Sequence, residues 1–234
     1  MKVLVTGAAG RVGTAVCREL AGRHYVRGLD LVPCAADEVL VGDLLDAETR
    51  ARALAGMEGV IHLAFCGQTR DVAGSYAINA QGTYQLLEAA QALGVSRFVY
   101  ASTLSVYSGA QWQEWATRGM MSEEVPPLPG EIYGLTKYLG EEACRMFGRN
   151  GLRCTILRLT GVTLPDHWEQ VVASRSGSST HVADVALSFR LALENDPPPA
   201  VVPVYHICGD HPNKPTPIER ARAALGFHPA YNLA

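Results

Sequence analysis

The sequence predicts an α/β fold, a doubly wound parallel sheet of the Rossmann type with a small, shortened C-terminal portion. Short apolar runs of strand length alternate with segments of helical periodicity up to about residue 159. The first run, 3–5, is followed by glycines at a Gly-x-x-Gly-x-x-Gly spacing and then by a helical pattern through about Leu20. With 234 residues the chain can bury a sizeable core, so we expect a sheet domain over 1–160 and a smaller portion over 161–234, interleaved with the last sheet elements.

Each predicted element has a recognisable pattern. Continuous apolar runs are typical of strands that helices cover on both faces. In the segment 75–93, apolar residues recur at helical spacing, and Gly94 provides a stop signal. The expected strands are 3–5, 25–29, 38–41, 60–64, 97–101 and 154–159. The expected helices are one that follows the glycines and runs through about residue 20, and those at 47–55, 75–93 and 131–147. Segments 174–180 and 197–199 are rich in Ser or Pro and are expected to be a loop and a linker.

Composition and charge argue against several classes of protein. The chain carries 20 basic and 23 acidic residues, so no nucleic-acid partner is expected. No apolar run approaches the roughly 18 residues of a membrane span, and the opening run is too short for a signal peptide. The six cysteines include no C-x-x-C pair, which favours reduced thiols in the cytoplasm over a disulfide framework or a metal site. Cys17, Cys154 and Cys208 lie in apolar runs and are expected to pack in the core.

The glycine-rich turn is the first candidate binding site. Glycines let the backbone turn sharply and approach a pyrophosphate, and the free N–H groups of the following helix then face its negative charge. A strand before the turn and a helix after it are the context that supports a dinucleotide-binding motif. The residues expected to contact the cofactor here are Gly7, Gly10, Arg11, Val12 and Gly13.

Asp30 narrows the choice of dinucleotide. It closes the second predicted strand about 20 residues beyond the glycines, where a carboxylate can accept hydrogen bonds from both ribose hydroxyls. The same charge repels a 2′-phosphate, and the next residue is Leu31 rather than an arginine, so we predict NAD rather than NADP. Arg11 and Arg27 are the nearby cations that leave tolerance of NADP open. The residues expected at the adenine edge are Asp43 and Leu44.

The chemistry is predicted at Tyr133 and Lys137, which are four residues apart and share one face of a helix. An ammonium close to a phenol stabilises the phenolate, so we expect it to lower the pKa of the tyrosine from about 10 toward neutrality. The resulting general base can take the proton of a substrate hydroxyl while hydride leaves the same carbon, and the lysine can also hold the nicotinamide ribose. Thr103, at the end of the fifth strand, offers a hydroxyl to hold the reacting oxygen, with Ser102 and Ser105 as alternatives.

Motifs spread over most of the chain carry a resemblance to one family. They occur in the family's order: TGAAGRVG, Asp30, GDLLD, HLA at 62–64, NAQGT at 79–83, YASTLSVY, YGLTK and THVADVA at 180–186. In these motifs the chain resembles the extended short-chain dehydrogenases/reductases of the NAD-dependent epimerase/dehydratase group. The resemblance implies that Tyr133 is the catalytic base, Lys137 its partner and Thr103 the third member of the triad.

The same resemblance has implications beyond the triad. It places Ala64 and Asn79 at the border of the cofactor, although Asn79 is alternatively a structural residue that kinks its helix. His62 lies inside a strand and is expected to be a packed core residue. The family also implies a possible homodimer, formed by the helices predicted at 75–93 and 131–147.

Departures from the family pattern concern the substrate. Only the segment 166–179 separates Pro165 from Thr180, where sugar-nucleotide enzymes place a much larger substrate portion. This compactness resembles uronate dehydrogenases, which oxidise a free sugar acid at C1, and Arg175 would then clamp the carboxylate. Thr103-Leu104-Ser105 stands where those enzymes have a Ser-Asn-His segment, which puts that specific activity in question.

Three functions therefore remain open. The first is an NAD-dependent oxidoreductase acting on a small sugar, sugar acid or related hydroxy or keto substrate. The second is an NAD-dependent sugar or sugar-nucleotide epimerase or dehydratase, and the third is a non-catalytic dinucleotide-binding protein. The intact set Thr103, Tyr133 and Lys137 argues against the third, because a binding protein has no need of the phenol.

The segment 111–121 is unusually rich in large apolar residues, among them Trp112 and Trp115. It lies between the fifth strand and the tyrosine helix. One interpretation is a lid or an apolar wall of the substrate site. The other is a satellite cluster on the domain surface or an oligomer contact.

Overall fold

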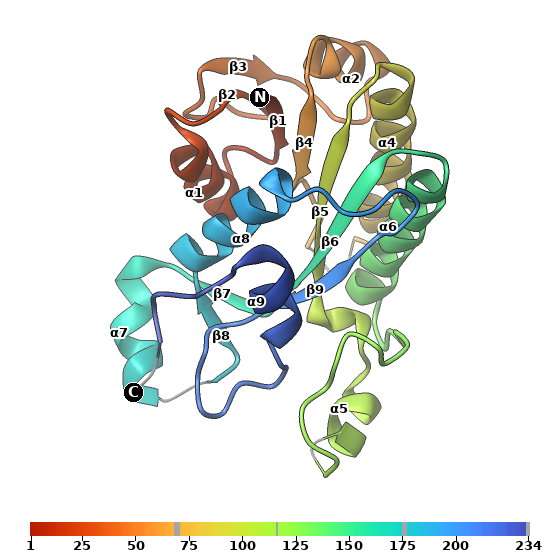
Figure 1. Cartoon of the computed structure of the whole chain (residues 1–234). Coiled ribbons are helices and arrows are strands. Elements are labelled where there is room, and N and C mark those ends of the chain that lie inside the picture. The colour runs from red at the N-terminus through yellow and green to blue at the C-terminus, as the bar shows by residue number, and fades with distance from the viewer. Residues whose placement is uncertain (68–70, 116, 175–176, 233–234) are drawn as a thin grey trace.

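The computed structural model describes residues 1–67, 71–115, 117–174 and 177–232, and its centre is a seven-stranded sheet (Figure 1). The strand order is β3-β2-β1-β4-β5-β6-β9, and every neighbouring pair is parallel. The strands are β1 (Lys2–Thr6), β2 (Tyr25–Asp30), β3 (Glu38–Val41), β4 (Gly59–His62), β5 (Arg97–Thr103), β6 (Arg153–Leu159) and β9 (Val204–Ile207). The predicted doubly wound sheet is thus confirmed. Its order reverses between β1 and β4, the position at which such folds bind their ligands.

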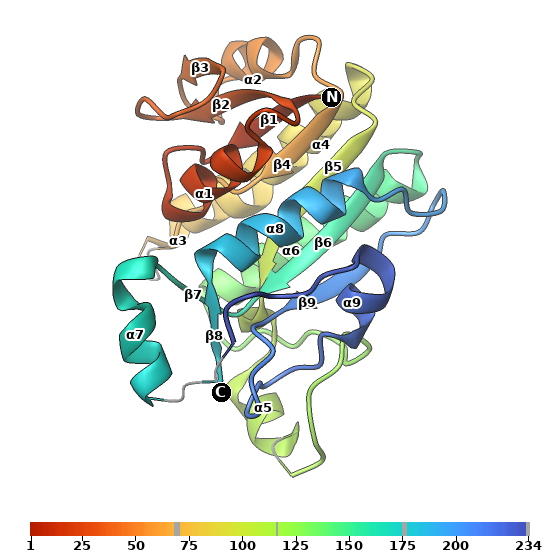
Figure 2. The same ribbon diagram turned by 60° about the vertical axis from the view of Figure 1, so that its left-hand side comes forward.

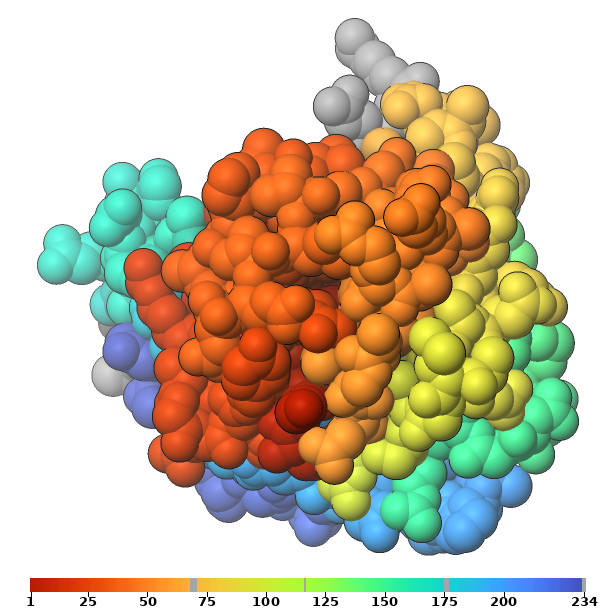
Figure 3. Space-filling model, turned by 90° about the horizontal axis from the view of Figure 1, so that it is seen from above, coloured from red at the N-terminus to blue at the C-terminus, as the bar shows by residue number. Residues whose placement is uncertain are grey.

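Helices cover both faces of this sheet (Figures 1 and 2). The helices are α1 (Arg11–Leu20), α2 (Ala47–Leu54), α3 (Val72–Ser75), α4 (Thr83–Ala92), α5 (Gly109–Trp115), α6 (Ile132–Arg149), α7 (Pro165–Ser174), α8 (Val182–Glu194) and α9 (Glu219–Leu225). One face packs against α1 and α8, and the other against α2, α4 and α6. Seen from above, the red and orange N-terminal elements cover the middle of the face turned to the viewer, and the yellow segment that contains α4 lies along one side (Figure 3).

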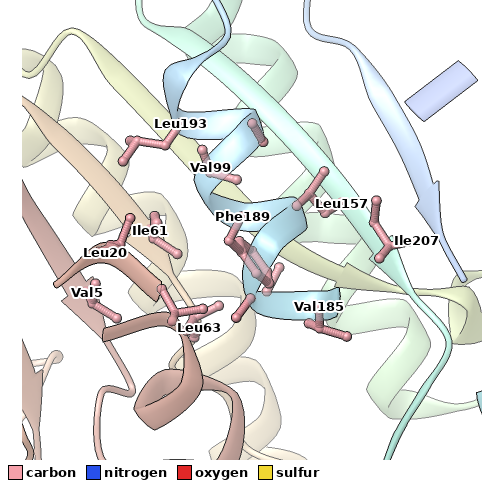
Figure 4. Close-up of a cluster of buried hydrophobic side chains, with 14 of the residues drawn as sticks. Val5, Leu20, Ile61, Leu63, Val99, Leu157, Val185, Phe189, Leu193 and Ile207 are labelled. Atoms are coloured by element: carbon pink, nitrogen blue, oxygen red, sulfur yellow. The ribbon is translucent and has the colours of Figure 1, made fainter. Parts of the chain in front are cut away.

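Alternating strand side chains divide the core into two clusters. Val5 faces the layer of α1 and α8, whereas its neighbour Leu4 faces the layer of α2, α4 and α6. The reason is that successive side chains of a strand point to opposite faces of the sheet. In the first cluster, Phe189 of α8 lies over aliphatic strand residues that include Ile61 and Val99 (Figure 4). Because α8 and β9 belong to it, the segment 161–234 contributes directly to this core.

The helix predicted over 75–93 is divided into three parts. Between α3 and α4 lies a π-helical segment, Tyr76–Gly82. The hydroxyl of Thr83 donates to the carbonyl of Asn79 at 2.8 Å, and the side chain of Asn79 reaches out to Cys66. A π-helical turn has a wider hydrogen-bond spacing than the 3.6-residue period on which the prediction rests, so apolar periodicity does not reveal it.

The C-terminal elements are where the sequence pattern predicts least. A small parallel sheet pairs β7 (Gly161–Thr163) with β8 (Ser179–His181), and α7 packs beside it. The expectation of a loop over 174–180 is therefore wrong at its end, since β8 begins at Ser179. These strands have only three residues each, too few to show an alternation in the sequence. The segment 197–199 lies outside all helices and strands, as predicted.

Two features are absent from the part of the chain that the structure describes. None of the helices there combines the length and apolar character needed to cross a bilayer. Within the same part of the chain, no group of His, Cys, Asp and Glu side chains is arranged to hold a metal ion. The cysteines predicted to be packing residues, Cys17, Cys154 and Cys208, are buried with free thiols.

Two buried histidines make the stability of the fold dependent on pH. His62 is a packed core residue, as predicted: Nδ1 lies 2.6 Å from Thr6 Oγ1 and Nε2 lies 3.0 Å from Thr83 Oγ1. Burial lowers the pKa of His62 to about 3, and burial also lowers the pKa of His206 to about 3. The stability that these neutral side chains provide is complete above the unfolded-state pKa of about 6.5 and is lost as the pH falls toward 3.

We therefore expect the free energy of unfolding to fall by roughly 2–3 kcal/mol per pH unit between about pH 6 and pH 5, a window above most carboxylate titration. Denaturant melts at several pH values would measure this slope. His62→Asn should reduce the slope by about 1.4 kcal/mol per pH unit, whereas the same change at the exposed His228 should leave it unchanged. An identical slope in wild type and His62→Asn would contradict the assignment.

Candidate active site

A cavity of about 610 Å³ opens at the carboxyl ends of the strands, where the strand order reverses. Its walls come from the glycine-rich turn, the ends of β2, β4 and β5, and the helix α6. The predicted residues that line it are Gly7, Gly10, Arg11, Val12, Gly13, Asp30, Asp43, Leu44, Ala64, Ser102, Thr103, Tyr133 and Lys137. Residues separated by more than a hundred positions in the sequence therefore meet at one site.

The glycine-rich turn has the geometry of an anion-binding cradle. Gly7 has φ +69°, and a Cβ there would lie 2.7 Å from the backbone nitrogen of Ala64. A Cβ at Gly13 would lie 2.1 Å from the carbonyl oxygen of Gly7, so neither position admits a side chain. α1 begins immediately after Gly10, with no side-chain cap and no acid in its first turn. Its N-terminal N–H groups are thus available to a pyrophosphate.

Asp30 is held in place beside this turn. Its Oδ2 accepts a hydrogen bond from the N–H of Ala9 at 2.9 Å, and its Oδ1 accepts one from the N–H of Leu31 at 2.7 Å. Each carboxylate oxygen has a further lone pair, so Asp30 can still accept hydrogen bonds from two ribose hydroxyls. Leu31, with 68 % of its surface exposed, lines the cavity beside it and offers no charge to a 2′-phosphate.

Arg11 and Arg27 are the two arginines that could pair with the 2′-phosphate of NADP, and only Arg11 lies at the site. The guanidinium of Arg27 donates to three backbone carbonyls at the end of α2 and pairs with Glu38 at 2.8 Å. These contacts keep it outside the cavity, so Arg27 is excluded as a phosphate clamp. Arg11 lines the cavity at the start of α1. The balance of charge around Asp30 therefore favours NAD.

The residues predicted at the adenine edge lie in the turn after β3. Asp43 closes this turn through its own side chain, whose Oδ1 accepts the N–H of Leu45 at 2.9 Å. Leu44 is buried against the second core cluster and presents an apolar surface to the cavity. An apolar side chain next to a carboxylate suits one face and one edge of a purine ring.

Asn79 supports the cofactor wall from behind. Its Oδ1 accepts the N–H of Cys66 at 2.8 Å, and its Nδ2 donates to the carbonyl of Cys66 and to Thr136 Oγ1. Asn79 itself does not line the cavity, whereas Ala64 and Cys66 do. The side chain of Asn79 thus fixes the loop after β4, and its place at the border of the cofactor stays a prediction.

Tyr133 stands at the first turn of α6, directly against the end of β5. The carboxylate of Glu131 caps the helix by accepting the N–H groups of Tyr133 and Gly134 at 2.9 and 2.6 Å. Burial raises the pKa of Tyr133 to about 12; a hydrogen bond with Thr103 opposes this shift, and the charge of Glu131 adds to it. Thr103 is thus within hydrogen-bonding reach of the phenol, as the predicted triad requires.

The position of Lys137 differs from the sequence-based expectation. Its side chain is 2 % exposed, and its ammonium lies 4.3 Å from the centre of the Tyr100 ring. Burial lowers the pKa of Lys137 to about 7, and the carboxylate of Glu141 opposes this shift. Lys137 is not among the groups that shift the pKa of Tyr133 here, so the expected lowering toward neutrality is absent.

The two serines proposed beside Thr103 have different environments. The hydroxyl of Ser102 donates to Glu141 Oε1 at 2.6 Å and is buried, so its proton is engaged within the protein. Ser102 also lines the first cavity, and its role as a substrate residue stays a prediction. Ser105 Oγ lies 3.3 Å from Thr103 Oγ1 and lines a second cavity. Arg175, the third candidate, lies outside the described residues.

The second cavity, of about 620 Å³, adjoins the first and shares Thr103, Leu159 and Thr160 with it. Its polar lining consists mainly of hydroxyl groups, with one carboxylate and one indole ring. The polar and aromatic members are Thr103, Ser105, Tyr107, Ser108, Trp112, Glu131, Thr160 and Ser178. Hydroxyls with an aromatic platform suit a small polyhydroxylated molecule.

The segment 111–121 forms a satellite cluster and also supplies part of a wall of the second cavity. Met121 is part of a small buried cluster with Tyr107 and Val125, and Trp112 and Trp115 pack against this cluster. Trp112, whose ring stands edge-on to Tyr107 with the centroids 5.8 Å apart, is also a wall of the second cavity. The segment is therefore a satellite core that presents one aromatic side chain to the site.

Two glutamates at this site are absent from the residues identified in the sequence. Glu131 precedes Tyr133 by two positions, where an acidic residue is a helix N-cap signal. Glu141 follows Lys137 by one helical turn, and its burial depends on Arg158, which arrives from β6. Glu131 therefore had a local signal from which the sequence could have identified it. Glu141 depends on its contact with Arg158, which forms only when the chain is folded.

Comparisons with known proteins agree with this geometry. The model of the NAD-dependent epimerase/dehydratase family matches residues 3–176. An L-arabinose 1-dehydrogenase (NAD(P)(+)) of Haloferax volcanii is 29 % identical over 250 residues, covering 100 % of this chain and 98 % of the relative. A uronate dehydrogenase of Agrobacterium fabrum is 31 % identical over 171 residues, covering 69 % and 62 %. An uncharacterised UDP-glucose epimerase of Bacillus subtilis is 33 % identical over 190 residues, covering 70 % of this chain.

The match spans 58 % of that epimerase's own length, so the chain covers less than two thirds of it. Among solved structures, a short-chain dehydrogenase/reductase superfamily protein of Agrobacterium tumefaciens with bound NAD is similar throughout. Its TM-score is 0.82 at 27 % identity, covering 99 % of this chain and 93 % of that chain. The fold described above is thus similar to one in which NAD has been observed.

Proposed function

The chain belongs to the NAD-dependent epimerase/dehydratase family, and on this basis we propose that it is an NAD-dependent dehydrogenase of the short-chain type. The proposed substrate is a small sugar, sugar acid or related hydroxy compound. One observation carries the proposal: Thr103, the hydrogen-bond partner of Tyr133, lies where the dinucleotide cavity and the hydroxyl-lined cavity meet. A substrate held in the second cavity therefore presents its reacting carbon to the nicotinamide end of the first.

Each residue has a distinct task in this proposal. Asp30 would hold the adenosine ribose of NAD and the start of α1 its pyrophosphate, and the bound dinucleotide would supply the hydride acceptor. Thr103 holds the substrate hydroxyl, and Tyr133 takes its proton. Burial raises the pKa of Tyr133 to about 12, so the base needs a cation nearby, and Lys137 is the buried cation one turn along the same helix.

The second cavity favours a free sugar over a sugar nucleotide. Among its described lining residues there is no lysine or arginine to meet a diphosphate, and the single charged group is the carboxylate of Glu131. Burying a diphosphate without a cation is strongly unfavourable. An epimerase acting on a sugar nucleotide is therefore the second candidate; the similarity to a protein named UDP-glucose epimerase supports it.

A substrate panel distinguishes these functions. We expect neutral aldoses or uronic acids, incubated with the protein and NAD, to yield NADH in proportion to the sugar consumed. Arg175 is proposed to clamp a carboxylate, so Arg175→Ala should raise the KM for a uronic acid about 10-fold or more and leave neutral sugars unaffected. Interconversion of sugar nucleotides without net NADH would instead support the epimerase. Tight NAD binding with no turnover of any substrate would support a binding protein.

We also propose that the protein works in the cytoplasm as a homodimer. The free thiols are consistent with a reducing compartment. Neighbouring helices α4 and α6 expose the large apolar side chains Tyr84, Leu135, Leu139 and Met146. A second copy of the chain would cover this face. Sedimentation velocity tests the dimer, and a monomer at all concentrations would exclude it.

A further inference from the structure

Glu141 lies at the centre of a buried polar cluster behind the catalytic residues. Its side chain is fully buried, and both carboxylate oxygens are saturated with hydrogen bonds. Oε1 accepts from Ser102 Oγ at 2.6 Å and from Arg158 Nε at 2.8 Å. Oε2 accepts from Arg158 Nη2 at 2.7 Å and from Arg145 Nη2 at 3.0 Å. Burial alone would raise the pKa of Glu141, but the hydrogen bonds and charge of Arg158 lower it, so the group is a carboxylate.

This cluster joins the three elements that form the site. Ser102 belongs to β5 and immediately precedes Thr103, and Glu141 belongs to α6, one turn after Lys137. Arg158 belongs to β6, lies in register with Ser102, and precedes Leu159, which lines both cavities. The relative positions of the threonine hydroxyl, the lysine and the cavity wall are thus set through one carboxylate.

The cluster also extends to the substrate wall. The remaining arm of Arg158 donates to the phenol oxygen of Tyr107, which is in turn 3.0 Å from His206 Nε2. Tyr107 lines the second cavity and contacts Trp112. A displacement of Arg158 would therefore reach the substrate side as well as the catalytic side.

A buried ion pair is not explained by stability alone. Removing two charged groups from water is costly, and apolar residues of similar volume commonly replace such pairs without loss of stability. The Glu141–Arg158 pair lines neither cavity, yet two of its direct partners belong to the site: Ser102 immediately precedes Thr103, and Tyr107 lines the second cavity. A buried ion pair that lies outside the cavities but bonds residues of the site points to a role in positioning those residues.

We propose that Glu141 is a positioning residue of the reaction, which orients Thr103 through Ser102 and holds Lys137 in its ammonium form. The proposal rests on the proposed function for its kinetic part, but its effect on Lys137 is independent of turnover. The groups that face Lys137 are Glu141 and Cys144 from α6, Tyr100 from β5 and His62 from β4. Of these, only Glu141 is a carboxylate, and Cys144, Tyr100 and His62 are buried in their neutral forms.

The composition of the chain allows a direct test. Lys2, Lys137 and Lys214 are its only lysines, so NMR of protein labelled at the lysine side chains gives three resolvable signals. Glu141→Gln preserves the shape of the side chain and removes its charge. We expect the titration midpoint of Lys137 to fall by about one pH unit or more in this variant, because the cation loses its compensating charge. We also expect kcat to fall at least about 10-fold.

Two matched variants separate the effect of the Glu141 charge from the effect of its hydrogen bond to Ser102. Glu142→Gln changes the neighbouring, half-exposed carboxylate of the same helix, which bonds Arg145, and should leave the midpoint and kcat unchanged. Ser102→Ala removes the link to β5 without changing any charge, so kcat should fall several-fold while the Lys137 midpoint is unaltered. If Glu141→Gln does not fold, Ser102→Ala still tests the positioning of Thr103.

An unchanged Lys137 midpoint in a folded Glu141→Gln protein would overturn the charge effect, whatever the substrate proves to be. Unchanged kcat in Ser102→Ala, measured with a substrate that the wild type oxidises, would overturn the positioning of Thr103. Absence of any substrate would count against the proposed function but would leave the Lys137 titration to decide the present proposal.

Discussion

Tyr133→Phe is expected to lower kcat by about 10²–10⁴-fold while leaving the affinity for NAD nearly intact. The phenol oxygen is the only group that the substitution removes, and general-base catalysis of this kind depends on it. The ring of Tyr133 remains and keeps its contact with Phe65, whose centroid is 5.9 Å away. Turnover with the sugar identified in the panel, together with NAD binding by calorimetry, measures both effects.

Tyr138→Phe provides a matched control for this experiment. Tyr138 is on the same helix but lines neither cavity, and it packs against the small cluster around Tyr107. We expect this control to retain wild-type turnover. If Tyr133→Phe also retained it, the assignment of the base would be refuted.

Asp30→Ala is expected to weaken NAD binding about 10–100-fold, the range for losing hydrogen bonds to a charged group. Because the repulsion of a 2′-phosphate disappears with the carboxylate, NADP should be affected less than NAD. The ratio of kcat/KM for the two cofactors is the decisive measurement. The substitution also removes the acceptor for the N–H of Ala9, so part of the loss arises from a looser glycine-rich turn.

Asp37→Ala separates the effect on the cofactor from a general effect of losing an acid. Asp37 accepts the N–H of Val26 at 2.8 Å and does not line the cavity. Its substitution should reduce stability without altering the NAD/NADP ratio. An unaltered ratio in Asp30→Ala would rule out the ribose role of Asp30.

The residues of the predicted cofactor site can be identified from the sequence because the patterns that mark them are local. Gly7 has φ +69°, and Gly13 is required by its close backbone contact with Gly7 within one strand–turn–helix unit, whose Ala9 N–H also holds Asp30. The alternation of Leu4 and Val5 between two cores likewise follows from strand geometry alone. Local patterns of this kind do not depend on the rest of the chain.

The remainder depends on contacts that form only when distant segments meet. Lys137 is four residues from Tyr133, but its ammonium lies on Tyr100 because burial and the ring of β5 determine its place. Ser102 is a residue type that can bind a substrate, but its hydroxyl donates a hydrogen bond to Glu141. The fold thus determines the contacts of residues whose type alone does not predict them.

A deuterium atom at the oxidised carbon of the substrate makes the proposed hydride transfer observable. With wild-type protein and NAD, mass spectrometry of the released dinucleotide should show one deuterium per sugar consumed, and Tyr133→Phe should show almost none. Sugar consumption without deuterium in the dinucleotide, or return of the deuterium to a sugar of altered configuration, would contradict the assignment of the protein as an NAD-dependent dehydrogenase.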